Sequence, residues 1–477
     1  MNSRKIGLYL GPILFILARF FLELEGLSDQ ANAVLASTLW IAIWWITEAI
    51  PIAATSLLPI ILFPLSGALP LADTTSSFGH RFVFLYLGGF ILALAIQKWN
   101  LHKRIALNII KVVGTNVQKI ILGFMVATAF LSMWISNTAT AVMMLPIGIA
   151  IIKQMKDLKN TSEDENLIFG KALMLSIAYS ASIGGIATLI GTPPNLVFAG
   201  IIQETYNIEI SFLKWFQFGL PISILLLAIS WVYLTKVAFK FKQNEFNKGK
   251  EEINRQLEEL GSISYEEKIV LSVFVLTGLA WILRTYLLNK FIPNLDDSII
   301  ALISGISLFL FQANNQEGKK EKIMNWEDAV KLPWGILLLF GGGLALAKGM
   351  ASSGLVAVIT EGIKSGGFSP IIVVCLLIVL MLFMTELMSN VALVAVLAPV
   401  VAGIAIGLNI PILNVLIPVT MASSCAFMLP MATPPNAIVF ASGYVKVSEM
   451  ARAGIILNVL AVGLLILYYL FVIPIIF

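Results

Sequence analysis

The chain has 477 residues, of which 58% are hydrophobic and only 12% are charged, and its mean hydropathy is +0.92. Soluble domains are nearer half apolar and a quarter charged, so the composition excludes an ordinary soluble protein. It predicts an all-α protein that crosses a lipid bilayer many times. The formal charge of +4 is modest, so it bears on membrane orientation and gives no reason to expect a nucleic-acid partner.

Apolar runs long enough to cross a bilayer recur along the chain, and about eleven spanning helices are expected. They occupy residues 6–24, 32–47, 51–69, 82–98, 167–203, 212–235, 266–287, 297–312, 333–350, 409–442 and 451–475. The first run follows Arg4 and Lys5. A cleaved signal peptide is the alternative, but the run is long and has no clear small-residue cleavage site. Cys375 and Cys425 lie in apolar segments and fit no zinc or redox spacing, which indicates packing residues.

Lysine and arginine predict the orientation, because they concentrate in cytoplasmic loops. Arg4 and Lys5 place the N-terminus inside, and the basic loops 236–268 and 314–332 fall on the same side by the count of crossings. Residues 203–211 contain no Lys or Arg and fall outside, as does the C-terminus. We therefore expect a multi-pass protein of the cytoplasmic membrane.

Two cytoplasmic segments are predicted to lie outside the spans. The stretch "KWNLHKRIALNIIKVVG" (98–114) places basic residues beside regularly spaced apolar ones. This pattern predicts an amphipathic helix on the membrane surface, with a simple basic loop as the alternative. Residues 236–265 have mixed charge and few aromatics, which is typical of a solvated connector.

The chain repeats itself in two halves. "LYLGGFILALA" (85–95) resembles "LLFGGGLALA" (338–347), "SNTA" (136–139) resembles "SNVA" (389–392), and "GTPPNLVF" (191–198) resembles "ATPPNAIVF" (432–440), in the same order. An odd number of crossings in each half would turn the second copy over, giving an inverted repeat. The predicted organisation is an N-terminal helix 1–31, a first repeat 32–235, a connector 236–265 and a second repeat 266–477.

The regions 118–153 and 368–405 are each two apolar arms joined at a polar break. The arms are short for full crossings, and the first tip, Ser136-Asn137-Thr138, has neither charge nor loop length. We favour re-entrant hairpins over external loops. Ser and Asn also cap helices, so capping alone is the plainer interpretation of the tip; the recurrence of the motif argues against it.

The segments 167–203 and 409–442 each contain Thr-Pro-Pro-Asn. Proline cannot continue a preceding helix but suits the first turn of a new one, so both are predicted to be broken helices. A proline kink without a ligand is the alternative. Half-helix N-termini favour an anion, whereas exposed carbonyls and hydroxyls favour Na⁺. Residues 120–152, 172–213 and 365–445 contain no Lys or Arg, so a bound anion would meet helix ends, hydroxyls, amides and any co-bound cation.

These motifs, with "WWITEAIP" (44–51) and "SSCAFMLPMATPPNAIV" (423–439), resemble the divalent-anion/sodium symporter family of dicarboxylate and sulfate carriers, over nearly the whole chain. The resemblance implies a homodimer of inverted repeats, in which a transport domain moves against a scaffold as an elevator. It implies a small dicarboxylate as substrate, Na⁺ as the coupling ion if transport is coupled, and no other cofactor.

The family motifs also imply site residues. Substrate would be held by Ser136, Asn137, Thr138, Thr192, Pro193, Ser389, Asn390, Val391, Thr433 and Pro434. One sodium position would use Ser132, Ser136, Asn137 and Gly191, and a second would use Thr385, Met388, Asn390 and Ala432. The family's second tip is usually another Ser-Asn-Thr, and this chain has Val391 in place of the threonine, so one hydroxyl is missing. Of the carboxylates, Glu386 is a candidate for ion or proton coupling and Glu48 for a structural role.

Three classes of function compete. An enzyme is disfavoured because the only histidines, His80 and His102, form no HExxH motif, and no Gly-x-Ser-x-Gly elbow occurs. A channel is the remote alternative, because two paired hairpins suit the alternating access of a carrier better than a continuous pore. We expect a carrier of C4 or C5 dicarboxylates such as succinate, malate, fumarate or 2-oxoglutarate. The hydroxyl missing at Val391 favours anion exchange, and the alternative is a sodium-coupled symporter of a dicarboxylate, sulfate or citrate.

Overall fold

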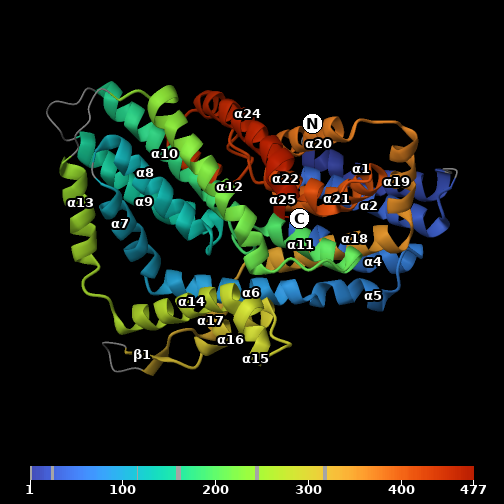
Figure 1. Cartoon of the computed structure of the whole chain (residues 1–477), viewed down its shortest axis with the longest axis horizontal. Helices are drawn as coiled ribbons and strands as arrows, with labels where there is room; N and C mark the ends of the chain where they lie inside the picture. The colour runs from blue at the N-terminus through green and yellow to red at the C-terminus, as the bar shows by residue number, and fades with distance from the viewer. Residues whose placement is uncertain are drawn as a thin grey trace.

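The computed structural model describes residues 3–22, 26–114, 116–156, 163–241, 247–314 and 320–476, and these are almost entirely helical (Figure 1). The helices of the first half are α1 (Ser3–Phe21), α2 (Asp29–Thr47), α3 (Ile52–Thr55), α4 (Leu58–Ser66), α5 (Leu71–Ser76), η1 (Ser77–Gly79), α6 (Arg81–Lys98), α7 (Leu101–Val113), α8 (Val117–Ser132), α9 (Asn137–Lys156), α10 (Glu163–Ile186), α11 (Pro193–Tyr206), α12 (Phe212–Val232) and η2 (Tyr233–Ala238).

The second half begins with the helix of the connector. Its elements are α13 (Asn247–Glu259), α14 (Tyr265–Leu283), η3 (Arg284–Leu288), α15 (Asn289–Phe291), α16 (Asp297–Ser307), β1 (Gln312–Asn314), β2 (Lys320–Lys322), α17 (Trp326–Ala329), α18 (Trp334–Ser352), α19 (Leu355–Ser365), α20 (Pro370–Met384), α21 (Asn390–Gly407), α22 (Ile412–Ala422), α23 (Pro434–Ala441), α24 (Val447–Phe471) and α25 (Ile473–Ile476). The all-helical fold class is confirmed.

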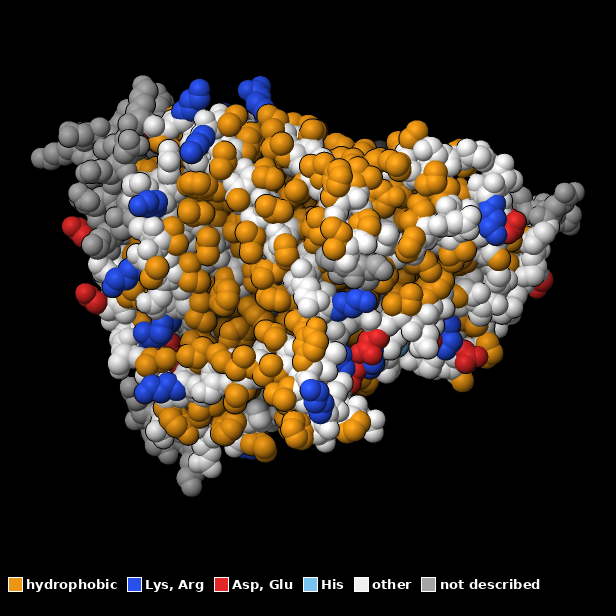
Figure 2. All heavy atoms as spheres, viewed as in Figure 1, with side chains coloured by type: hydrophobic (Ala, Val, Ile, Leu, Met, Phe, Trp, Pro, Cys, Tyr) orange, Lys and Arg blue, Asp and Glu red, His pale blue; other side chains and the backbone are white. Residues whose placement is uncertain are grey.

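Within the described ranges, seven helices are long and apolar enough to cross a membrane. These segments are Leu71–Lys98, Glu165–Ile186, Phe212–Ala238, Tyr265–Phe291, Trp334–Ser352, Asn390–Gly407 and Val447–Ile475. Five other apolar stretches, α8 among them, are helical over only 10–17 residues. Hydrophobic side chains cover most of the face drawn in Figure 2, with charged side chains mainly toward its margins, as a lipid-facing surface requires.

Two expected spans differ in the structure. Residues 51–69 form α3 and α4 instead of one helix, because Pro51 precedes α3 and Pro59 lies in the first turn of α4. The expected helix 297–312 ends at Ser307. The chain then leaves the helix for the antiparallel pair of β1 and β2, which lies within the predicted basic loop 314–332 and the residues just before it.

The two segments expected to lie in the cytoplasm are more ordered than the sequence suggests. The amphipathic helix is confirmed as α7, but its apolar face, including Leu107 and Ile110, is buried in the protein and packs against α8. The connector contains α13, which packs on α7 and α9. The carboxylate of Glu252 in α13 is only 3% exposed and pairs with Arg255 at 2.6 Å, so this part of the connector is docked and not merely solvated.

The elements that carry the polar breaks pack crosswise between the two halves. α11 of the first half contacts α21 of the second, and α23 of the second half contacts both α9 and α10 of the first. In Figure 1, α8 and α9 lie at the left, α21 lies at the right, and α10, α12 and α24 run between them. This packing brings each hairpin against the broken helix of the other half.

Candidate functional site

The first tip is a short turn between α8 and α9. α8 ends at Ser132 and α9 begins at Asn137. The Ser136 hydroxyl accepts a hydrogen bond from the Ala139 amide at 3.3 Å, so helix capping, the plainer interpretation of this motif, is one role of Ser136. Asn137 has a different role, because its side chain turns toward α10.

Three oxygen atoms surround the amide group of Asn137. The Ser132 hydroxyl lies 2.6 Å from the Asn137 amide oxygen and 2.6 Å from the Ala181 carbonyl. If the amide is turned over, its nitrogen donates to Ser132 Oγ at 2.6 Å and to the carbonyls of Ala181 and Gly191 at 3.2 Å each. Asn137 can therefore satisfy these oxygens with its nitrogen, or present its own oxygen to a cation among them. Hydroxyl and carbonyl oxygens suit a hard cation such as Na⁺.

The break after α10 is held open by a buried asparagine. α10 ends at Ile186 and α11 begins at Pro193. The Asn195 amide nitrogen donates to the carbonyls of Gly185 at 3.1 Å and Thr188 at 2.8 Å. The Asn195 amide thus takes the place of the backbone N–H donors that the last carbonyls of a helix lack. The sequence prediction of a broken helix is confirmed.

Glycines allow the tip and the break to approach each other. A Cβ on Gly185 would lie 2.6 Å from the Asn137 amide oxygen, and a Cβ on Gly184 would overlap the Ala129 carbonyl of α8. The Thr188 hydroxyl also donates to the Met133 carbonyl at 2.5 Å, which ties the broken segment to the hairpin turn. The two motifs therefore form one packed unit.

The second half repeats this geometry. The Thr385 hydroxyl lies 2.6 Å from the Asn390 amide oxygen and 2.6 Å from the Ser423 carbonyl. The Asn436 amide nitrogen donates to the carbonyl of Ala426 at 3.1 Å and to the carbonyl of Leu429 at 3.0 Å. Each contact matches one in the first half, so the sequence repeat is also a repeat of hydrogen-bonding pattern.

The other predicted residues lie on the same turns with different exposure. Thr138 and Pro434 are exposed, Ser136, Pro193, Met388 and Ser389 are half-buried, and Gly191, Thr192, Ala432 and Thr433 are buried. Val391 is half-buried and packs against the hydrophobic core. The structure thus brings Ser132, Asn137 and Gly191 into one cluster and Thr385 and Asn390 into another.

The two carboxylates have different surroundings. Glu386 is 3% exposed and is held by backbone amides of Phe427, Met428 and Leu429. Glu48, at the end of α2, is exposed and pairs with Arg4 at 3.2 Å.

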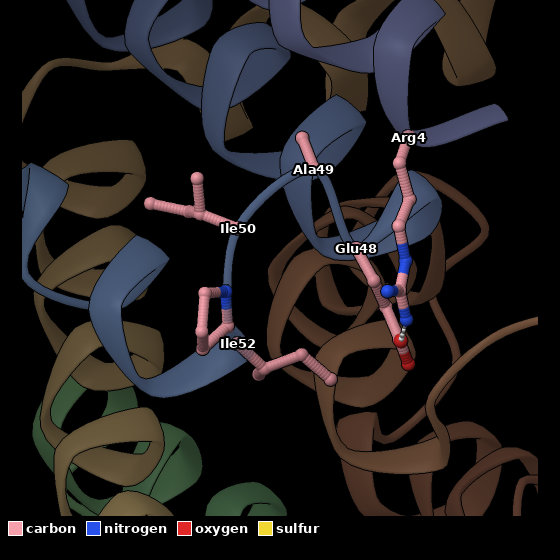
Figure 3. Close-up of a pocket in the computed structure, with 6 residues that line it drawn as sticks. Arg4, Glu48, Ala49, Ile50 and Ile52 are labelled. Atoms are coloured by element: carbon pink, nitrogen blue, oxygen red, sulfur yellow. Dashed lines mark hydrogen bonds and ion pairs between the residues drawn. The ribbon is translucent and has the colours of Figure 1, made fainter. Parts of the chain in front are cut away.

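Figure 3 shows the surface pocket of about 340 Å³ that the Arg4–Glu48 pair lines with Ala49, Ile50, Pro51 and Ile52. None of the tip or break residues lines this pocket, so the pocket is separate from the candidate site.

Sequence reasoning missed several residues of the site. Asn195 and Asn436 stand in the quoted Thr-Pro-Pro-Asn motif but were not expected to hold the breaks. Their recurrence in both halves was the available signal. The carbonyls of Ala181 and Ser423 could not be predicted from the sequence, because the backbone carbonyl of any residue can accept such a hydrogen bond.

Comparison with known proteins gives a matching family and close relatives over nearly the whole chain. The profile of the family described as "Sodium:sulfate symporter transmembrane region" matches residues 4–476. The chain is 46% identical over 477 residues to the "Sodium-dependent dicarboxylate transporter SdcS" of Staphylococcus saprophyticus, covering 99% of this chain and 92% of that protein. It is 47% identical over 479 residues to the protein of the same name from Staphylococcus aureus strain USA300, with the same coverage.

Solved structures resemble the fold at low sequence identity. The YdaH transporter of Alcanivorax borkumensis superposes with a TM-score of 0.56 at 13% identity, covering 85% of this chain and 88% of that one. MtrF of Neisseria gonorrhoeae superposes with a TM-score of 0.57 at 11% identity, covering 98% and 94%. These two likenesses concern the fold alone. From the full-length family match and the close relatives, the chain belongs to the sodium:sulfate symporter family, whose members are membrane transporters and not enzymes.

Proposed function

We propose that the chain is a sodium-coupled transporter of small dicarboxylates. The observation that carries the proposal is the pair of matching oxygen clusters at Asn137 and Asn390. Each cluster lies where a hairpin tip meets a broken helix, as expected of cation sites in transporters. The names of the relatives include both sodium and dicarboxylate.

The relatives favour sodium coupling over the anion exchange predicted from the sequence. That prediction rested on the hydroxyl missing at Val391, but the Val391 side chain packs against the hydrophobic core. The contacts of the Thr385 hydroxyl with the Asn390 amide oxygen and the Ser423 carbonyl form without a hydroxyl at position 391. We therefore propose the symporter alternative as the main function.

The substrate site we propose lies between the two tips. Ser136, Asn137 and Thr138 would hold one carboxylate of a C4 or C5 dianion, and Ser389 and Asn390 the other. Helices α9 and α21 begin at Asn137 and Asn390, and their N-termini carry partial positive charge. Thr192, Pro193, Thr433 and Pro434 would line the site from the broken helices. Bound Na⁺ would supply positive charge, because residues 120–152, 172–213 and 365–445 contain no Lys or Arg.

We further propose that transport follows an elevator mechanism in a homodimer of inverted repeats, with the N-terminus in the cytoplasm and the C-terminus outside. The crosswise packing of α11 on α21 and of α23 on α9 supports one moving unit built from both halves. The repeated hydrogen-bonding pattern supports the division into repeats at 32–235 and 266–477.

Uptake into proteoliposomes tests the function. Radiolabelled succinate should enter empty vesicles when an inward Na⁺ gradient is imposed, and choline in place of Na⁺ should abolish the uptake. Internal unlabelled succinate or malate should not be required. Uptake that ignores Na⁺ but depends on an internal dicarboxylate would instead establish exchange.

The variant Val391→Thr tests whether position 391 contributes to coupling. Because the Val391 side chain packs against the core, restoring a hydroxyl should leave the half-saturating Na⁺ concentration within about twofold. A large gain in substrate affinity or in sodium dependence would show that the missing hydroxyl does set the coupling.

A further inference from the structure

Glu386 follows Thr385 of the second oxygen cluster directly in the chain and is not one of the predicted sodium ligands. It lies just after the end of α20, and the residue is only 3% exposed. The amides of Phe427 and Met428 donate to Oε1 at 2.8 and 2.9 Å, and the amide of Leu429 donates to Oε2 at 3.1 Å. One side chain therefore fixes the backbone of the break between α22 and α23.

A fourth donor comes from α24. The fully buried Asn458 donates from Nδ2 to Glu386 Oε1 at 2.7 Å. One turn earlier, Gly454 lets α24 approach the break, because a Cβ there would overlap the Phe427 carbonyl. Glu386 thus joins the second hairpin, the break and α24 at one point.

The carboxylate acts only as an acceptor in this arrangement. All four partners are N–H donors, which is the hydrogen-bonding role of an ionised carboxylate. Among the described residues no Lys, Arg or His forms an ion pair with Glu386. A buried charge without a countercharge is costly, and a cation bound at the neighbouring Thr385 would offset it.

The first half has no such charge at the matching position. The residue after Ser132 is Met133, and the tie between tip and break there is the neutral bond from the Thr188 hydroxyl to the Met133 carbonyl at 2.5 Å. The two oxygen clusters are therefore alike in their ligands but different in their charge.

We propose that Glu386, held by Asn458, is a positioning residue for the second sodium position. It keeps the break in place against Thr385 and Asn390, and its charge raises the affinity of that position for Na⁺ above the affinity of the first. This inference rests on the proposed sodium coupling. Glu386 itself acts through the ligands and does not contact the dicarboxylate.

The test compares Glu386→Gln, which removes the charge at nearly constant shape, with Glu386→Asp, which keeps the charge. In proteoliposomes, Glu386→Gln should raise the half-saturating Na⁺ concentration about tenfold, equivalent to about 1.4 kcal/mol, while the KM for succinate at saturating Na⁺ changes less than about twofold. Glu386→Asp should recover most of the sodium affinity. Glu48→Gln, at an exposed carboxylate of α2, is the matched control and should behave as wild type.

A second measurement does not depend on transport. Na⁺ should raise the melting temperature of the purified protein in detergent, with choline as the control. Asn458→Leu, which removes one of the four donors, should raise the Na⁺ concentration for half the effect about threefold. A purely structural anchor would lower the melting temperature equally at every Na⁺ concentration, and that result would overturn the inference.

The outcomes separate the two proposals. If the wild type responds to Na⁺ and Glu386→Gln responds at the same concentrations, the role of Glu386 is wrong and the proposed function stands. A wild type that shows neither Na⁺-driven uptake nor Na⁺-dependent stabilisation would overturn both.

Discussion

Single asparagines decide the chemistry of each tip. Asn137 and Asn390 each contribute the amide oxygen that faces a hydroxyl at 2.6 Å. An amide can present either an acceptor or a donor to the same neighbours, which suits a position that must be satisfied both with and without a cation. No aliphatic residue of similar size can do this.

Replacing either asparagine by alanine should abolish Na⁺-driven dicarboxylate uptake. In the proposed site the side chain would provide a cation ligand and a polar contact for the substrate, and losing a hydrogen-bonding partner at a buried polar site costs about 1–3 kcal/mol. Asn137→Ala and Asn390→Ala should still purify as folded protein, as judged by gel filtration. Near-normal uptake by both variants at normal expression would remove Asn137 and Asn390 from the site.

A glycine next to the first cluster provides a finer test. In Gly185→Ala the new methyl would lie 2.6 Å from the Asn137 amide oxygen, so it should displace the ligand and raise the half-saturating Na⁺ concentration several-fold. Gly463→Ala in α24 is the matched control, because a Cβ there meets nothing within 4 Å. Equal behaviour of the two variants would show that the clash does not reach the site.

At the scale of elements, the sequence predicted the broken helices and the hairpins because proline and repetition are local signals. Pro193 and Pro434 begin α11 and α23 as the loss of the amide donor requires. The sequence did not predict the four hydrogen-bond donors around Glu386, because one of them, Asn458, lies 72 positions further along the chain. Contacts between distant segments leave no pattern in a single sequence.

The packing of α7 against the protein also could not be predicted from the periodicity of its apolar residues. An amphipathic pattern shows that one face is apolar, but it does not distinguish a lipid surface from a protein surface. In the structure that face packs on α8. His102 is buried with it, and its Nδ1 lies 2.9 Å from the Ile96 carbonyl.

This burial predicts an acid-sensitive contact. Burial is the largest cause that lowers the pKa of His102 from its ordinary value of 6.5. Folding therefore favours neutral His102. The contribution of this residue to the free energy of unfolding is complete above pH 6.5 and is lost as the pH falls through the lowered pKa. On moving from pH 7.5 to 5.5 the wild type should lose more thermal stability than His102→Gln, which keeps a donor for Ile96 but does not titrate. Equal losses in both proteins would contradict the prediction.

The whole molecule combines two copies of one hydrogen-bonding pattern that pack across each other. α11 contacts α21, and α23 contacts α9, so neither hairpin can shift without its neighbouring broken helix from the other half. The elements of the proposed substrate site should therefore move as one body. The direction of that movement depends on which loops face the cytoplasm.

Single cysteines test the orientation in a background with Cys375 and Cys425 replaced by alanine. Ser262→Cys, at an exposed position between α13 and α14, should react with an impermeant maleimide only from the cytoplasmic side. Asn207→Cys, at the exposed end of α11, should react only from outside. The reason is that Lys and Arg concentrate around the first position and are absent from residues 203–211. Labelling in inside-out and right-side-out vesicles gives the two readouts. The reverse pattern would invert the topology. Labelling of both positions from one side would contradict the single crossing expected between them at residues 212–235, and with it the odd number of crossings that the inverted repeat requires.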